Sequence, residues 1–243
     1  MSKKNTYEII FEDADFIAIN KPAGLLTIPD RYNSTLPSAY QLLKQKYSNI
    51  YVVHRLDVGT SGVLLFAKNS EAHSFANNQF AEHSVKKIYI AVLEGVLNKD
   101  FIEIDIPLLQ NPSGKGGVIP SARGKSSLTI INTIERFKNA TLIKAQLKTG
   151  RLHQLRAHAA AIGYPLLVDN IYGNHTEFYI SSIKRRFNLK KNAEELPIIS
   201  RPTMHAAELN FIHINGQNIM LEAKYPKDFV ALIQILTKYA KIV

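Results

Sequence analysis

A succession of short strand-like runs, joined mostly by turns of hairpin length, constrains the fold of this chain more than any other feature. Helical periodicity is rarer, and it predicts helices over 35–47, 70–82 and 152–162 and after Pro226. The strand-like runs are rich in β-branched and aromatic residues and cover 8–11, 16–20, 52–57, 63–67, 87–93, 102–106, 127–137, 141–148, 206–214 and 218–223. Because strands outnumber helices and many adjoin tight turns, the pattern predicts an α+β fold with a mixed, largely antiparallel sheet and flanking helices.

The sequence also favours a single domain over 1–243. It contains no internal repeat and no linker long or polar enough to separate two domains. Of its 243 residues, 46% are hydrophobic and 21% are charged, so the chain can bury a substantial core. This composition excludes a disordered, collagen-like or disulfide-stapled class.

The absence of cysteine removes several chemistries at once. The chain can form no disulfide, thiolate nucleophile or cysteine-based zinc or iron–sulfur site. A reducing compartment suits this composition, and the first residues lack the apolar stretch of a signal peptide. Apolar runs such as 62–67 are too short to span a bilayer. We therefore expect a cytoplasmic protein with no membrane partner.

A large positive charge points to a polyanionic partner. Thirty Lys and Arg against twenty Asp and Glu give a formal net charge of +10, which favours nucleic acid. The least patterned segment, 174–201, carries Lys184, Arg185 and Arg186 and then Lys190 and Lys191. Two interpretations of this segment stay open, contact with RNA phosphates and a solvated run of charges.

Several familiar sites are excluded by spacing. Residues 124–126 (GKS) resemble the end of a phosphate-binding loop, but Ile119 stands where that loop requires its first glycine. Residues 59–63 resemble a nucleophile elbow but have valine in place of its second glycine. His153 and His158 are five positions apart, whereas two metal-binding histidines on one helix face are four apart. We expect no metal site.

One candidate site lies at 54–62 (HRLDVGTSG). It places an imidazole, a guanidinium and a carboxylate beside a glycine-bracketed loop, directly before a predicted buried strand. From the residues alone, Asp57 has two interpretations. It caps a turn through its own backbone, as an aspartate at a strand end most often does, or it acts as a catalytic carboxylate.

The second candidate site lies at 149–158 (TGRLHQLRAH), where a helix is predicted to begin. It offers many hydrogen-bond donors and few acceptors, on Arg151, His153, Gln154, Arg156 and His158. Arginine and glutamine suit planar two-point recognition of an anion, whereas lysine would better serve a solvated face. The pattern therefore favours anion binding, with a solvated basic helix face as the alternative.

Taken together and in this order, the motifs resemble the RluA-type RNA pseudouridine synthases over about 8–229. The resemblance is carried by NKPAG at 20–24, HRLD and TSG within 54–62, AK at 67–68, Lys87 and Tyr89 in KKIYIAVLEG, TGRLHQLRAH at 149–158 and DNIYG at 169–173. Two departures lie outside the catalytic positions. GKSSLT at 124–129 replaces the common Lys-Pro-Ala before the threonine, and Val168 precedes Asp169 where glycine is common. The resemblance is to a stand-alone catalytic domain, without the small S4 domain that many relatives carry.

The resemblance implies an enzyme that converts uridine to pseudouridine in folded ribosomal or transfer RNA without a cofactor. It implies that Asp57 is the catalytic carboxylate, which either attacks the sugar or draws a proton from it. It also implies that Tyr89 stacks on the target base, that Arg156 pairs with Asp57, and that Arg55 fills the gap left by the flipped nucleotide. Flipping costs a few kcal/mol, which stacking and a plugging side chain offset.

The expected partner is structured RNA, bound by a monomer. The predicted RNA-binding residues are Arg55, Arg151, His153, Gln154, His158, Lys184, Arg185 and Arg186. A glycosidase or nucleoside hydrolase is one alternative, although it would need a second carboxylate in a comparable motif. A non-enzymatic RNA-binding or ribosome-assembly factor is another. It explains the charge but leaves Asp57, Tyr89 and Arg156 without a role.

Overall fold

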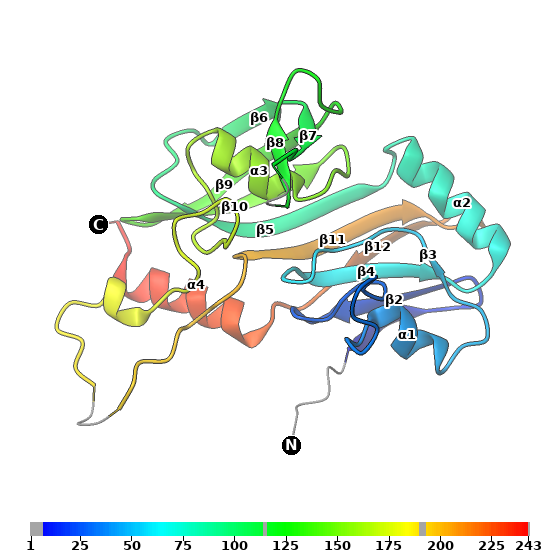
Figure 1. Ribbon diagram of the computed structural model, residues 1–243, viewed down its shortest axis with the longest axis horizontal. Helices are drawn as coiled ribbons and strands as arrows, with labels where there is room; N and C mark the ends of the chain where they lie inside the picture. Colours follow the sequence, from blue (N-terminus) through cyan, green and yellow to red (C-terminus); the bar gives the residue numbers. More distant parts are fainter. Residues whose placement is uncertain (1–6, 114–115, 190–192, 243) are drawn as a thin grey trace. The chain divides into compact units, whose positions relative to one another are not determined.

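The computed structural model describes residues 7–113, 116–189 and 193–242, which form two compact units (Figure 1). Unit 1 combines the chain up to Ile88 with His205–Lys224, and unit 2 combines Tyr89–Met204 with the chain from Tyr225 onward. The expectation of one domain over 1–243 stays a prediction.

Unit 1 is built on a mixed sheet. Its elements are β1 (Glu8–Glu12), β2 (Phe16–Lys21), α1 (Ala39–Lys44), β3 (Tyr51–Val52), β4 (Ser61–Ala67), α2 (Ser70–Ala81), β11 (Met204–Ile212) and β12 (Asn218–Glu222). The order β1-β2-β4-β11 is extended by β12 on β11 and by β3 on β4. The β4–β11 pair is parallel, and the pairs β1–β2, β2–β4, β3–β4 and β11–β12 are antiparallel.

The parallel pair explains one glycine. Gly62 lies opposite Ala206, and its φ is +122°. A Cβ added at Gly62 would lie 2.1 Å from the Ala206 carbonyl oxygen, so only glycine fits there. This close approach anchors the start of β4, directly after the candidate loop at 54–62.

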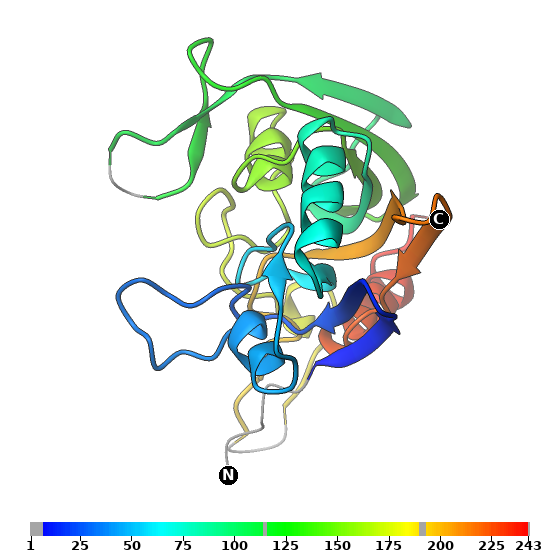
Figure 2. The same cartoon turned by 90° about the vertical axis from the view of Figure 1, so that its right-hand side faces the viewer.

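One hydrophobic cluster of unit 1 lies between the sheet and α2 (Figure 2). All seven residues of β4 are buried, as the unbroken apolar run predicts. Ala72 and Ala76 of α2 join them in the core, with small side chains that allow a close approach of helix to sheet.

Unit 2 contains a second set of strands and two main helices. Its elements are β5 (Lys86–Glu94), which belongs to unit 2 from Tyr89 onward, β6 (Phe101–Asp105), β7 (Leu108–Gln110), β8 (Val118–Pro120), β9 (Leu128–Arg136), β10 (Ala140–Leu147), α3 (Gln154–Ala161), the short 3₁₀ helix η1 (Ile180–Ser182) and α4 (Lys227–Tyr239). The strand order is β5-β10-β9-β6, and β9 is antiparallel to both β10 and β6. The β7–β8 hairpin packs beside α3 (Figures 1 and 2).

The predicted α+β fold with a mixed, largely antiparallel sheet is confirmed, but several element boundaries were wrong. The strand expected over 52–57 is reduced to β3, and β7 and β8 were not predicted. The sequence predicts Thr35 and Ser70 as helix caps, but Ser38 caps α1 by accepting from the Gln41 N–H, and Asn69 caps α2. The Gly-rich run at 111–117 (NPSGKGG) predicts a mobile hairpin tip, which lies partly outside the described residues. Among those described, no helix has the length and apolarity needed to cross a membrane.

Candidate active site

The backbone on both sides of Asp57 is pinned by the segment 21–27. On one side, the Thr27 hydroxyl donates to the Leu56 carbonyl at 2.9 Å and accepts from the Leu56 N–H at 3.1 Å. On the other side, the Val58 carbonyl accepts from the Gly24 N–H at 2.7 Å. The Asp57 carbonyl itself accepts from the Thr60 N–H at 3.0 Å. Asp57, which is partly buried, therefore lies in a turn of fixed geometry rather than in a strand.

A fully buried ammonium group supports the same turn. Lys21 is 0% exposed, and its Nζ donates to the carbonyls of Pro22 at 3.0 Å, Leu25 at 2.8 Å and Val58 at 3.4 Å. A buried charge without such partners would be very costly, so these carbonyls are part of what permits a lysine here. The NKPAG motif thus contributes directly to the Asp57 turn.

His54 serves this region as a neutral acceptor. Its Nε2 accepts from the Leu65 N–H at 3.0 Å, and its ring stacks on Phe80 with centroids 5.0 Å apart. Burial lowers the pKa of His54 to about 3, and the positive charge of Lys87 adds to the shift. An imidazole this hard to protonate does not act as a general acid near neutral pH. The neighbouring Arg55 is exposed, as its predicted contact with RNA requires.

Two predicted RNA-binding residues are instead structural. Gln154 is 2% exposed and accepts from the Thr149 hydroxyl and the Arg151 N–H, while its amide donates to the Leu128 carbonyl and the Thr129 hydroxyl. His158 is 0% exposed and contacts the Thr129 hydroxyl and the Ile106 carbonyl through its two ring nitrogens, both at 2.9 Å. The prediction that they contact RNA is therefore not supported, because their polar atoms are used inside unit 2.

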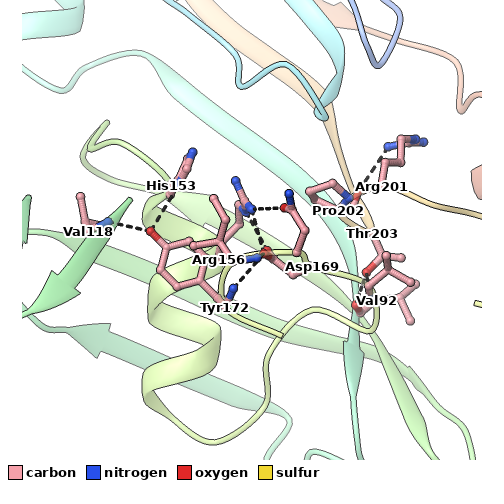
Figure 3. Close-up of polar contacts among 12 residues, drawn as sticks. Val92, Val118, His153, Arg156, Asp169, Tyr172, Arg201, Pro202 and Thr203 are labelled. Carbon is pink, nitrogen blue, oxygen red and sulfur yellow. Dashed lines mark hydrogen bonds and ion pairs between the residues drawn. The ribbon is translucent and has the colours of Figure 1, made fainter. Parts of the chain in front are cut away.

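Arg156 is buried in the first turn of α3, where it forms an ion pair with Asp169 (Figure 3). Its Nε lies 2.6 Å from Asp169 Oδ2, and its Nη2 lies 2.8 Å from Asp169 Oδ1. Burial by itself raises the pKa of the Asp169 carboxyl, but Arg156 and two backbone N–H groups hold it below its ordinary value. The predicted pairing of Arg156 with Asp57 involves different units and stays a prediction.

His153 and Arg151 lie at the N-terminal end of α3. His153 is the N-cap residue, with φ +50° and no side-chain capping bond, and its Nδ1 lies 3.2 Å from the Tyr172 hydroxyl (Figure 3). That hydroxyl also accepts from the Val118 N–H at 2.7 Å, which ties the start of β8 to the 169–173 turn. The partly exposed Arg151 donates to the Ser126 carbonyl at 3.1 Å.

The basic segment after η1 is only partly available to a ligand. The Lys184 ammonium lies 5.7 Å from the ring centroid of Phe187 and 5.5 Å from that of Tyr239, which indicates cation–π contacts. Arg185 and Arg186 are exposed. Lys190 and Lys191 lie outside the described residues.

One group in the described part of the chain has the spacing of metal ligands. Single ligand atoms of Asp13, Asp15 and His213 lie within 4.8 Å of one another. However, His213 Nδ1 accepts from the Asn215 N–H at 3.2 Å, so a neutral ring carries its proton on Nε2. That nitrogen faces Asp13 Oδ2 at 3.0 Å. A protonated nitrogen cannot ligate a metal, so this group fits a polar cluster better than a metal centre.

Comparison with known proteins identifies the class. Residues 15–161 match the family model described as RNA pseudouridylate synthase. The ribosomal large subunit pseudouridine synthase D of Zymomonas mobilis subsp. mobilis is 34% identical over 241 residues, covering 94% of this chain and 72% of the relative. The dual-specificity RNA pseudouridine synthase RluA of Vibrio vulnificus is 35% identical over 212 residues, covering 85% and 78%.

A solved structure shares the fold. The human RNA pseudouridylate synthase domain containing 1 superposes with a TM-score of 0.72 at 22% identity, covering 100% of this chain and 99% of that one. The fold, the matched model and the relatives together define an RNA pseudouridine synthase. Within that class the chain belongs to the RluA-type family, which confirms the resemblance drawn from its motifs.

Two residues that the structure places around Arg156 have no role predicted from the sequence. Asp169 and Tyr172 entered only as letters of the DNIYG motif. A signal was present, because a fixed arginine in a helix needs an anion and Asp169 follows the apolar run 166–168. The contact itself crosses thirteen positions and a turn, and no periodicity predicts that.

Proposed function

We propose that this enzyme converts uridine to pseudouridine in a structured ribosomal or transfer RNA, with Asp57 as the catalytic carboxylate. Membership of the family carries the proposal, since its relatives include a ribosomal large subunit enzyme and dual-specificity RNA enzymes. The pinned turn around Asp57 supports the assignment, because a reacting group must be held in a fixed geometry.

The reaction is an isomerisation and needs no other reactant. The bond between N1 of the base and C1′ of the sugar breaks, the base turns, and C5 forms the new bond to C1′. The proton on C5 leaves and N1 takes up a proton, so atoms and electrons balance. Asp57 participates as the carboxylate, either by attacking C1′ or by removing a proton from the sugar. Both routes require the ionised form.

Tyr89 and Arg55 have the environments that their proposed roles need. Tyr89 lies on β5 and is 9% exposed, so the protein holds most of this residue in place. Aromatic stacking on a base contributes about 1–3 kcal/mol. Arg55 is exposed two positions before Asp57, and a long side chain there can occupy the space of an extruded nucleotide.

The substitution Asp57→Asn tests the assignment. It removes the charge while keeping nearly the same shape, so we expect turnover below a few per cent of wild type, with RNA affinity and unfolding free energy within about 1 kcal/mol. Release of tritium from RNA labelled at uridine C5 measures turnover, because the C5 proton leaves in the reaction. Substantial residual turnover would return Asp57 to the role of a turn cap.

The same assay separates this proposal from a nucleoside hydrolase. A hydrolase would release free uracil and leave the label on it, whereas the isomerase releases tritium and retains the base in the RNA. Mapping pseudouridines in total RNA from cells with and without the gene identifies the substrate and position. We further propose that the enzyme works in the cytoplasm as a monomer, and sizing of the purified protein with and without RNA tests the oligomeric state.

A further inference from the structure

We propose that Asp169 is a positioning residue that fixes the orientation of the Arg156 guanidinium for catalysis. The inference rests on the proposed function, in which Arg156 acts on the catalytic carboxylate. It adds a residue that touches neither the substrate nor the reacting atoms.

The contact between the two side chains fixes the plane of the Arg156 guanidinium. Asp169 accepts from both Nε and Nη2 of Arg156, at 2.6 and 2.8 Å, and a two-point contact holds the planar guanidinium against rotation. Nη1 takes no part in this pair, so the geometry decides where that nitrogen points. The Asn170 side-chain oxygen accepts from Nη2 at 3.3 Å, and the Tyr172 ring centroid lies 5.3 Å from the guanidinium carbon. Three residues of the 169–173 turn therefore contact one arginine.

Asp169 is itself immobilised. It is 1% exposed, and its Oδ1 accepts from the N–H groups of Ile171 at 2.9 Å and Tyr172 at 3.0 Å. Its own N–H donates to the His175 carbonyl at 2.9 Å, and its carbonyl accepts from the Gly173 N–H at 3.2 Å. A residue whose carboxylate accepts two backbone N–H bonds and whose own backbone makes two more cannot follow a moving arginine, so the turn 169–173 acts as a rigid support.

The location in α3 gives the pair a second purpose. Arg156 lies in the first helical turn, where the helix dipole disfavours a positive charge. The Asp169 carboxylate offsets that unfavourable interaction. The buried Asp169 carboxylate thus stabilises the Arg156 guanidinium at a helix position that would otherwise disfavour a positive charge.

Unit 2 contains a matched pair that serves as a control. Arg201 Nε lies 2.6 Å from Asp228 Oδ2 and Arg201 Nη2 lies 2.9 Å from Asp228 Oδ1, with the Phe229 N–H also donating to Oδ1 at 2.7 Å. This pair lies at the start of α4 and involves no residue of the proposed catalytic set. It shares the two-point contact of the Arg156 pair, and we expect it to have no part in the reaction.

The experiment compares Asp169→Asn with Asp228→Asn in the full-length protein, using single-turnover tritium release, RNA affinity and circular dichroism at a temperature where both variants are folded. We expect Asp169→Asn to lower the rate constant at saturating RNA by at least about thirtyfold while RNA affinity stays within about twofold. Asp228→Asn should leave the rate within about threefold of wild type. Equal rates for the two variants would overturn the proposal.

A double-substitution cycle separates positioning from a general structural role. In an Arg156→Lys background, where the two-point contact is already lost, Asp169→Asn should change the rate by less than about threefold. The same fold-loss in both backgrounds would show that Asp169 acts independently of Arg156, and so would contradict the proposal. If Asp169→Asn does not fold, Asp169→Glu keeps the charge and displaces the carboxylate, and a wild-type rate in that variant would also contradict it. A wild type that releases no tritium would instead refute the proposed function.

Discussion

At position 156, we expect the reaction rate to depend on the planar shape of the arginine side chain and not only on its charge. Lysine at this position keeps the charge, but a single ammonium cannot make the two-point contact that Asp169 receives from Nε and Nη2. We expect Arg156→Lys to lower single-turnover rates at least about tenfold, equal to about 1.4 kcal/mol of transition-state stabilisation. Tritium release at saturating RNA measures the effect. A near-normal rate would show that charge alone suffices, and would argue against a fixed pairing with Asp57.

At this scale the sequence predicts the role of a residue where that residue belongs to a motif. It does not predict the role where this depends on whether the side chain is buried. Asp57, Tyr89 and Arg156 could be proposed from their motifs alone. Gln154 and His158 were predicted to bind RNA because they share a donor-rich segment with Arg151, and the sequence does not show that six of the eight α3 residues are buried. Asp169 received no role, because its partner is set by a turn that brings distant positions together.

At the scale of elements, the His54 side chain links the candidate loop at 54–62 to β4. Because its pKa differs between the folded and unfolded chain, His54 makes the stability of the protein depend on pH. The folded pKa of about 3 lies below the ordinary 6.5, so between these values the unfolded chain takes up a proton that the folded chain does not. Stability is therefore lost as the pH falls from about 6.5, with a slope of up to about 1.4 kcal/mol per pH unit from this residue.

Glutamine at position 54 tests this expectation, because its side-chain oxygen can accept from the Leu65 N–H but cannot be protonated in this range. Chemical denaturation from pH 7 to pH 4 should give a shallower loss of stability for His54→Gln than for wild type. His83→Asn, at an exposed histidine after α2, is the matched control and should keep the wild-type slope. Parallel curves for wild type and His54→Gln would rule out this residue as a source of acid sensitivity.

Element identity was predicted well, while element boundaries were set by contacts the sequence does not display. The 52–57 run has strand-like residues, but the backbone groups of Leu56 bond to the Thr27 hydroxyl and not to a neighbouring strand. Thr35 has the right chemistry for a helix cap, yet its N–H and hydroxyl both bond to Asn33, and Ser38 caps α1 instead. Local propensity was overridden in each case by a specific polar partner.

At the scale of the whole molecule, the net charge of +10 predicts binding to RNA that weakens as salt increases. Arg185 and Arg186 are exposed, whereas Lys184 is engaged with two aromatic rings. We expect the double change of Arg185 and Arg186 to glutamine to weaken binding to all RNAs alike, with each lost phosphate contact reducing the log–log salt slope by up to about one unit. Lys184→Gln should have a smaller effect.

Binding titrations at several salt concentrations measure these slopes, and turnover of bound RNA should stay close to wild type. An unchanged slope in the double variant would place the phosphate contacts elsewhere, with Arg151 and Lys68 the next candidates. Of these two, Lys68 is less available, because its ammonium bonds to Glu12 at 2.9 Å and to the Asp13 carbonyl.

The parallel pairing of β4 with β11 also has a consequence for how the protein is made. Ser61 and His205 bond to each other across 144 positions of the chain, so a ribosome completes β4 long before it synthesises the neighbour that covers one edge of that strand. Through this interval the nascent chain carries a largely apolar strand whose β11 edge is unpaired, a state that favours association with other chains. Unit 1 therefore cannot finish folding during synthesis of its own first segment. It must wait until residues 89–204 have been synthesised, because the folding of its first segment depends on His205–Lys224.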